Sequence, residues 1–224
     1  MVRFVSTSIV TPESSGHDHK EFSRRIDLGP LDLQLLLADH IQKGIFLHKP
    51  TTTTSSSSLN NTNLLVQHLK AALSQTLDIL RLAETENHYN TTSFSIDCNG
   101  AGALFVHAAF DGVTVADILD PIVVPDDVVY SFFSMNGVLN YEGAVSRSPL
   151  VAVQITELVD GVFVGCSMNH CVCDGTFFWH LFNTWSEISR GGGFNDGVSS
   201  PHFVFGRDYV ENIVSHPSRS HTLP

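Results

Sequence analysis

The chain has a strand–turn–strand–helix pattern of hydrophobic positions between residues 151 and 190. Residues 151–158 and 162–168 are hydrophobic segments of strand length that flank Asp160-Gly161, a dipeptide typical of a tight hairpin turn. After them, large apolar residues recur at helical spacing until three glycines, 191–193, end the pattern: Phe178, Leu181, Phe182, Trp185 and Ile188. The pattern predicts a β-hairpin followed by a helix over residues 176–190.

The preceding part of the chain predicts further strands and one long helix. We expect strands at residues 2–9, 41–47, 92–97 and 103–110, a turn and a short helical or extended piece after Leu28, and a short helix at 115–119. Residues 64–82 predict an amphipathic helix, with one apolar stripe: Leu65, Leu69, Ala72, Leu73, Leu77 and Leu80. Residues 11–25, 50–58 and 120–127 are polar, low-complexity or acidic and are expected to be loops. The whole predicts an α+β domain in which helices cover one side of a mixed sheet.

Composition limits the function classes. Hydrophobic residues make up 42% of the chain and charged residues 16%, which is typical of a soluble globular protein. The net charge of -11 argues against nucleic acid or an anionic membrane as a partner. The first ten residues are too short and too polar for a secretory signal, and no apolar run reaches membrane-spanning length. We therefore expect a cytoplasmic protein whose four cysteines (98, 166, 171 and 173) are reduced.

Two stretches share the pattern His-x-x-x-Asp-Gly, and their contexts differ. The pattern is weak by itself, because about one His-x-x-x-Asp match is expected by chance in a chain of this composition. His107 lies within the alternating run 104–110, where it shares a strand face with Phe105 and Ala109, so we interpret it as a strand histidine. His170 falls at the junction between the hairpin and the helix, where rigid elements on both sides would hold a base.

The residues around His170 resemble the signature of the plant BAHD acyltransferases, enzymes of specialised metabolism. The resemblance rests on residues 169–188, which begin Asn169-His170-Cys171-Val172-Cys173-Asp174-Gly175, and on further stretches in the family's order: 28–33, 65–74, 97–100 with 105–106, 132–137 and 149–157. It implies a chloramphenicol-acetyltransferase-like two-layer sandwich and an HxxxD-type transferase. His170 would be the catalytic general base, and Asp174 and Gly175 would have structural roles. Acyl-CoA would be a co-substrate, with no bound cofactor or metal, and a small molecule would offer a hydroxyl or amine as the acceptor.

The chain also departs from the family pattern. Family members are about twice as long, and their second half carries an Asp-Phe-Gly-Trp-Gly motif that these 224 residues lack. We therefore expect residues 1–190 to be the N-terminal acyltransferase domain and 191–224 to begin the connector to an absent C-terminal half. Alone, such a half is expected to be inactive and to self-associate through the uncovered face.

The chemistry at His170 leaves several alternatives open. A neutral imidazole, with an ordinary pKa of about 6.5, can take the proton from an attacking hydroxyl or amine. Asp174 could orient that imidazole as in a catalytic triad, whereas the family implies that it points away toward an arginine of the other half. Zinc is a competing ligand, since His170, Asp174 and the cysteines 166, 171 and 173 are all zinc-ligand types, but an extended strand would send them to opposite faces. Other function classes are a non-catalytic pseudoenzyme or dimerising fragment, and a lyase that uses the same histidine.

Overall fold

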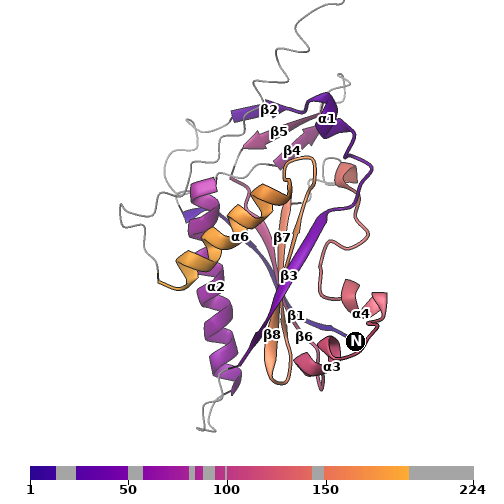
Figure 1. Cartoon of the computed structure of the whole chain (residues 1–224). Coiled ribbons are helices and arrows are strands. Elements are labelled where there is room, and N and C mark those ends of the chain that lie inside the picture. The colour runs from indigo at the N-terminus through magenta and orange to yellow at the C-terminus, as the bar shows by residue number, and fades with distance from the viewer. Residues whose placement is uncertain are drawn as a thin grey trace, which may run out of the picture.

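A five-stranded mixed sheet forms the centre of the molecule (Figure 1). The computed structural model describes residues 1–13, 24–49, 58–80, 84–87, 94–98, 100–142 and 149–191. The strands lie in the order β1 (Arg3–Val10), β6 (Ala103–Ala109), β7 (Val151–Glu157), β8 (Gly161–Met168) and β3 (Ile41–His48). β6 and β7 are parallel, and every other neighbouring pair is antiparallel. β7 and β8 therefore occupy the protected middle of the sheet, which explains why the hairpin is so apolar.

The predicted hairpin is present, and residues at its turn also contact neighbouring elements. Asp160 Oδ1 accepts a hydrogen bond of 2.8 Å from the backbone N–H of Val115, the first residue of the short helix α3 (Val115–Leu119). A Cβ added at Gly161 would lie 2.6 Å from the carbonyl oxygen of Leu47 on β3. Gly161, the first residue of β8, is thus required by the close packing of β8 against β3.

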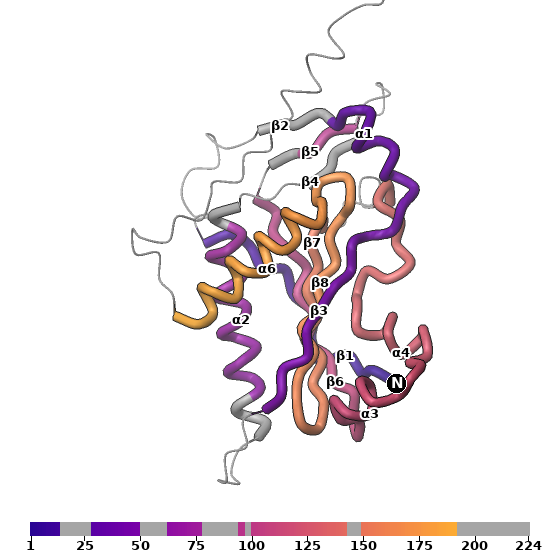
Figure 2. Tube along the Cα trace, in the orientation of Figure 1, coloured from indigo at the N-terminus to yellow at the C-terminus, as the bar shows by residue number. Residues whose placement is uncertain are grey.

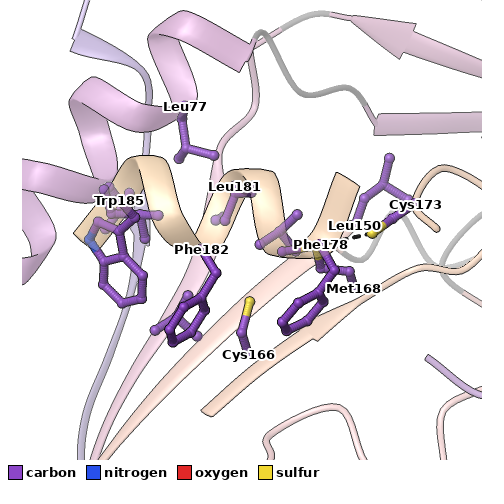
Figure 3. Close-up of a cluster of buried hydrophobic side chains, with 14 of the residues drawn as sticks. Leu77, Leu150, Cys166, Met168, Cys173, Phe178, Leu181, Phe182 and Trp185 are labelled. Carbon is purple, nitrogen blue, oxygen red and sulfur yellow. Dashed lines mark hydrogen bonds between the residues drawn. The ribbon is translucent and has the colours of Figure 1, made fainter. Parts of the chain in front are cut away.

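Two long helices, α2 (Ser58–Leu80) and α6 (Gly175–Ser189), cover one face of the sheet (Figure 1). Their apolar sides meet the strands in one large core that includes the expected Phe178, Leu181, Phe182 and Trp185 of α6, which Figure 3 labels, with Ile188 packed against it. The indole N–H of Trp185 donates to the backbone carbonyl of Leu69, at 3.0 Å, and so joins α6 to α2. The predicted stripe of α2 is correct for Leu69, Ala72, Leu73 and Leu77, but the helix begins at Ser58, within the segment that we had predicted to be a loop.

A second, smaller core lies on the opposite face and contains Val115, Phe132, Leu158 and Phe163. α3 and α4 (Asp126–Tyr130) lie on this side, and Figure 2 shows the chain after α4 running along the sheet toward α1 (Pro30–Leu33). The prediction of a loop through residue 127 is wrong at its end, because Asp126 and Asp127 form the exposed first turn of α4. Carboxylates are favourable there because a helix N-terminus carries a partial positive charge.

A separate three-stranded antiparallel sheet consists of β2 (Arg24–Asp27), β5 (Phe94–Cys98) and β4 (Glu84–Asn87), in that order. Of these strands only β5 was predicted, because β2 and β4 are short and rich in charged or polar residues. Most of the low-complexity loop at residues 50–58 and nearly all of the segment 191–224 lie outside the described residues.

The structure confirms the predicted fold class, an α+β mixed sheet with helices packed against it. The strands expected at 2–9, 41–47 and 103–110 and the helices expected at 115–119 and 176–190 all occur within a residue or two of their predicted bounds. Among the described helices, none has the length and apolar character needed to cross a membrane.

Candidate functional site

His170 lies on a tight turn between the end of β8 and the start of α6. Met168, the last residue of β8, pairs with Ile41 on one side and Val151 on the other, so the turn begins at a firmly held strand end. Residues 170–172 form the turn, and Asp174 precedes the first residue of α6. The assumption of an extended strand through the motif, which we used to separate the zinc-ligand types by face, is therefore wrong.

The backbone of this turn is held by two buried asparagines. The N–H of His170 donates to Asn140 Oδ1 at 2.9 Å, and the N–H of Cys171 donates to Asn169 Oδ1 at 3.0 Å. Asn169 Nδ2 in turn donates to the carbonyl oxygen of Asn140 at 2.8 Å, and the N–H of Asn169 donates to Leu150 O at 2.8 Å. Successive N–H groups of the turn thus have defined partners, which fixes the path of the chain through His170.

The imidazole of His170 is bound less tightly than its backbone. The residue is partly buried, and its Nδ1 atom is enclosed with no hydrogen-bond partner among the described residues. No hydrogen bond to another described side chain orients the ring. The position of the imidazole therefore depends on the backbone that carries it.

Asp174 directs its carboxylate along the chain and not toward His170. Its backbone has extended geometry at the N-cap of α6, and Oδ1 accepts a hydrogen bond of 2.8 Å from the N–H of Phe177. Among the described residues no hydrogen bond joins Asp174 to His170, so the arrangement differs from that of a catalytic triad. Gly175 is the first residue of α6, and a Cβ added to it would touch nothing within 4 Å.

The cysteines of the motif are packing residues. Cys171 and Cys173 are buried in the main core, as is Cys166 of β8. Burial raises the pKa of the Cys173 thiol to about 12, and the nearby Asp174 carboxylate adds to this effect while the Lys43 ammonium opposes it. A thiol with so high a pKa is a poor nucleophile and a poor metal ligand at neutral pH. In the part of the chain that the structure describes, no three His, Cys, Asp or Glu side chains are grouped so that they could hold a metal ion.

A cationic side chain lies close to the motif. Lys43 of β3 places Nζ 5.2 Å from the ring centroid of Trp179 and 5.7 Å from that of Phe178. Trp179 is one of the few large apolar residues of α6 that is exposed. The start of α6 therefore has a partly exposed aromatic surface with one positive charge above it.

The second copy of the pattern has a different environment, as predicted. His107 is buried in β6, and its Nε2 lies 2.6 Å from Glu157 Oε1 at the end of β7. Asp111 instead forms a two-pronged ion pair with Arg3, with nitrogen–oxygen distances of 2.9 and 3.0 Å. The sheet thus encloses His107, whereas His170 lies at its rim.

Three residues near the site were not identified from the sequence: Asn140, Asn169 and His40. Asn140 and Asn169 hold the turn, and His40 Nδ1 donates to Val138 O at 2.8 Å, two residues before Asn140. Burial lowers the pKa of His40, against the smaller opposing effects of that hydrogen bond and of Asp39 and Glu142. The sequence offers one local signal for these residues, the position of Asn169 beside His170. It offers none for Asn140, because the contacts of Asn140 join segments far apart in the sequence.

The chain matches the sequence model of the Transferase family over residues 1–216. Among curated relatives, an uncharacterised acetyltransferase of Arabidopsis thaliana is 40% identical over 197 residues, covering 85% of this chain and 41% of the relative. The BAHD acyltransferase DCR of the same plant is 30% identical over 194 residues, covering 85% of this chain and 39% of the relative. The chain therefore spans about two fifths of the length of these relatives.

Solved structures agree with the fold. Vinorine synthase matches with a TM-score of 0.68 and 22% identity, covering 94% of this chain and 47% of that one. F. graminearum TRI101, in a complex with coenzyme A and T-2 mycotoxin, matches with a TM-score of 0.57 and 15% identity, covering 77% of this chain and 41% of that one. The sequence matches, supported by this shared fold, establish that the chain belongs to the Transferase family, which includes the BAHD acyltransferases.

Proposed function

We propose that the chain carries the general base of an acyl-CoA-dependent acyltransferase, and that this base is His170. The observation that carries the proposal is the placement of His170 on a backbone-fixed turn at the rim of the sheet, within a chain of this family. His107, the other candidate of the same pattern, is buried against Glu157 and has no comparable access.

The proposed reaction moves an acyl group from a thioester to an oxygen or nitrogen. The acceptor hydroxyl or amine attacks the thioester carbonyl and gives its proton to the imidazole. The carbon–sulfur bond then breaks, and the departing coenzyme A sulfur takes that proton from the imidazolium. Because Nδ1 is enclosed in the protein, Nε2 is the nitrogen that would accept the proton. General-base assistance of this kind contributes roughly 10²–10⁴-fold in rate.

The substrate classes are proposed by analogy with relatives. TRI101 has been crystallised with coenzyme A and a small-molecule toxin, which supports an acyl-CoA donor and a small acceptor here. The proposed acyl transfer, with His170 as the base, needs no bound cofactor. The buried thiols near the motif are consistent with a cytoplasmic protein with reduced cysteines.

Asp174 has a structural role in this proposal, and Gly175 is the first residue of the helix that it caps. The carboxylate of Asp174 satisfies a backbone N–H that the first turn of a helix would otherwise leave without a partner. It thereby fixes where α6 begins, at Gly175, and does not take part in proton transfer.

We further propose that residues 1–190 form one half of the enzyme and that residues from 191 onward lead to a second half. Exposed apolar side chains lie on both edge strands of the large sheet: Phe4, Val5 and Ile9 of β1, and Ile45 and Leu47 of β3. An edge strand with unpaired backbone groups and apolar side chains favours association with other chains. Light scattering of residues 1–224 should therefore show dimers or larger species, and a monodisperse monomer would contradict this part of the proposal.

The proposed activity is tested by thiol release. Residues 1–224, alone and joined to the C-terminal half of a BAHD relative, would be incubated with several acyl-CoA donors and with alcohol and amine acceptors. Acceptor-dependent release of free coenzyme A from the joined protein is expected. Acceptor binding without turnover under all these conditions would instead favour the pseudoenzyme alternative, and elimination of a substrate group without acyl transfer would favour a lyase.

A further inference from the structure

Asn140 is almost fully buried, at 1% exposure, and it lies in the segment after α4. A buried amide is costly unless its hydrogen-bonding groups have partners. Those of Asn140 do, and within the described part of the chain the partners come from two places in the fold. One is the turn that carries His170, and the other is the segment 35–39 between α1 and β3.

Three bonds join Asn140 to the segment 35–39. Its side-chain Nδ2 donates to Leu35 O at 2.8 Å and to Asp39 O at 3.3 Å, and its backbone N–H donates to Ala38 O at 3.0 Å. Beside these, His40 Nδ1 donates to Val138 O at 2.8 Å. The stretch 138–140 is therefore anchored to the chain that enters β3.

Two further bonds join the same residue to the catalytic turn. Asn140 Oδ1 accepts the N–H of His170 at 2.9 Å, and the carbonyl oxygen of Asn140 accepts Asn169 Nδ2 at 2.8 Å. The amide of Asn140 thus uses its oxygen for the backbone of His170 and its nitrogen for the segment 35–39. A side chain with only donors or only acceptors could not make both connections.

We propose that Asn140 is a positioning residue that sets the place of the His170 imidazole through the His170 backbone. No described side chain holds the imidazole ring itself by a hydrogen bond, so a shift of the His170 backbone would move the ring directly. The catalytic part of this inference rests on the proposed function, whereas the structural part does not. A misplacement of about 1 Å in a reacting group can cost about 100-fold in rate.

The structural part is tested by hydrogen exchange of the His170 amide in residues 1–224. Asn140→Ala removes the acceptor, and exchange at His170 should rise by about tenfold, the effect of losing one hydrogen bond. Asn136→Ala is the matched control, because Asn136 is exposed in the same segment, and its exchange at His170 should equal that of wild type. Equal exchange in Asn140→Ala and wild type would overturn the proposal.

Asn140→Asp provides a second variant of nearly the same shape. A protonated carboxyl can donate to Leu35 O and accept from His170, whereas a carboxylate would face the carbonyl oxygens of Leu35 and Asp39. After correction for intrinsic exchange rates, protection of the His170 amide in this variant should be greater at pH 5 than at pH 8. A protection that does not change with pH would contradict the role given to both ends of the amide. This comparison also keeps the test valid if Asn140→Ala does not fold.

The catalytic part is tested in the active protein joined to a second half. Positioning of the base predicts that Asn140→Ala lowers kcat by about 10–100-fold with little change in KM. A loss confined to KM would overturn this part. If wild type shows no His170-dependent acyl transfer while exchange at His170 still responds to Asn140, the proposed function fails and the structural link remains.

Discussion

The carboxylate of Asp174 accepts a hydrogen bond from the backbone N–H of Phe177 at 2.8 Å, and this contact begins helix α6. His170 and Asp174, the two residues that define the motif, therefore have different roles. Asp174 sets the start of the helix, and His170 lies on the turn that follows β8. The four-residue spacing of the pattern therefore spans the turn at residues 170–172 and ends at the N-cap of α6.

This contact predicts how substitutions of Asp174 divide between stability and chemistry. Asp174→Ala should lower the free energy of unfolding by about 0.5–2 kcal/mol, because the N-cap acceptor is lost. Asp174→Asn should stay close to wild type, since asparagine caps helices about as well as aspartate. Denaturant unfolding of residues 1–224 measures both. Equal, large losses for the two variants would mean that the negative charge of Asp174 matters more to the fold than its cap.

The space around Gly175 predicts that a methyl group added there is tolerated, whereas one added at Gly161 lowers stability. Since a Cβ at this position touches nothing within 4 Å, Gly175→Ala should leave the thermal midpoint unchanged or raise it slightly. The matched control is Gly161→Ala, whose Cβ would lie 2.6 Å from Leu47 O and should cost about 1–3 kcal/mol. A midpoint that falls as far in Gly175→Ala as in the control would show that the start of α6 needs glycine for another reason.

The burial of His40 predicts that the stability of the fold depends on pH. Burial lowers its pKa in the folded protein below the ordinary 6.5, so the folded state binds fewer protons than the unfolded state in this range. The contribution to stability is therefore fully present above about pH 6.5 and is lost as pH falls through the lowered pKa of His40. Asp39 and Glu142 favour the charged form and make the effect smaller.

The measurement for His40 is the free energy of unfolding between pH 7 and pH 5. Wild type should lose more stability over this interval than His40→Asn, in which the amide nitrogen can still donate to Val138 O. His48→Asn, at an exposed position at the end of β3, should behave as wild type does. Parallel curves for wild type and His40→Asn would show that His40 does not titrate with folding.

Much of the fold follows from local patterns in the sequence. The hairpin and α6 were predictable because their apolar residues follow strand or helix spacing over a continuous stretch, as Leu181 and Trp185 of α6 do in the main core. β2 and β4 were not, because four-residue strands with charged side chains form only when β5 lies between them. The start of α2 was missed for a similar reason, since serines and asparagines give no apolar stripe.

The site was only partly predictable. His170 and Asp174 could be found because the motif is continuous and its neighbours mark a strand and a helix. Asn140 could not, because its significance comes from bonds to residues about 30 and 105 positions away in the chain. The side-chain connections that hold a turn are tertiary contacts, and no local spacing encodes them.

The proposed function depends most on His170 being the base, and one comparison of variants tests this directly. In residues 1–224 joined to the C-terminal half of a BAHD relative, acyl transfer from coenzyme A thioesters would be measured for wild type, His170→Ala and His107→Ala. We predict that His170→Ala loses about 10²–10⁴-fold in kcat while His107→Ala, corrected for the fraction folded, keeps most of the activity. Turnover that survives the loss of His170 but not the loss of His107 would contradict it.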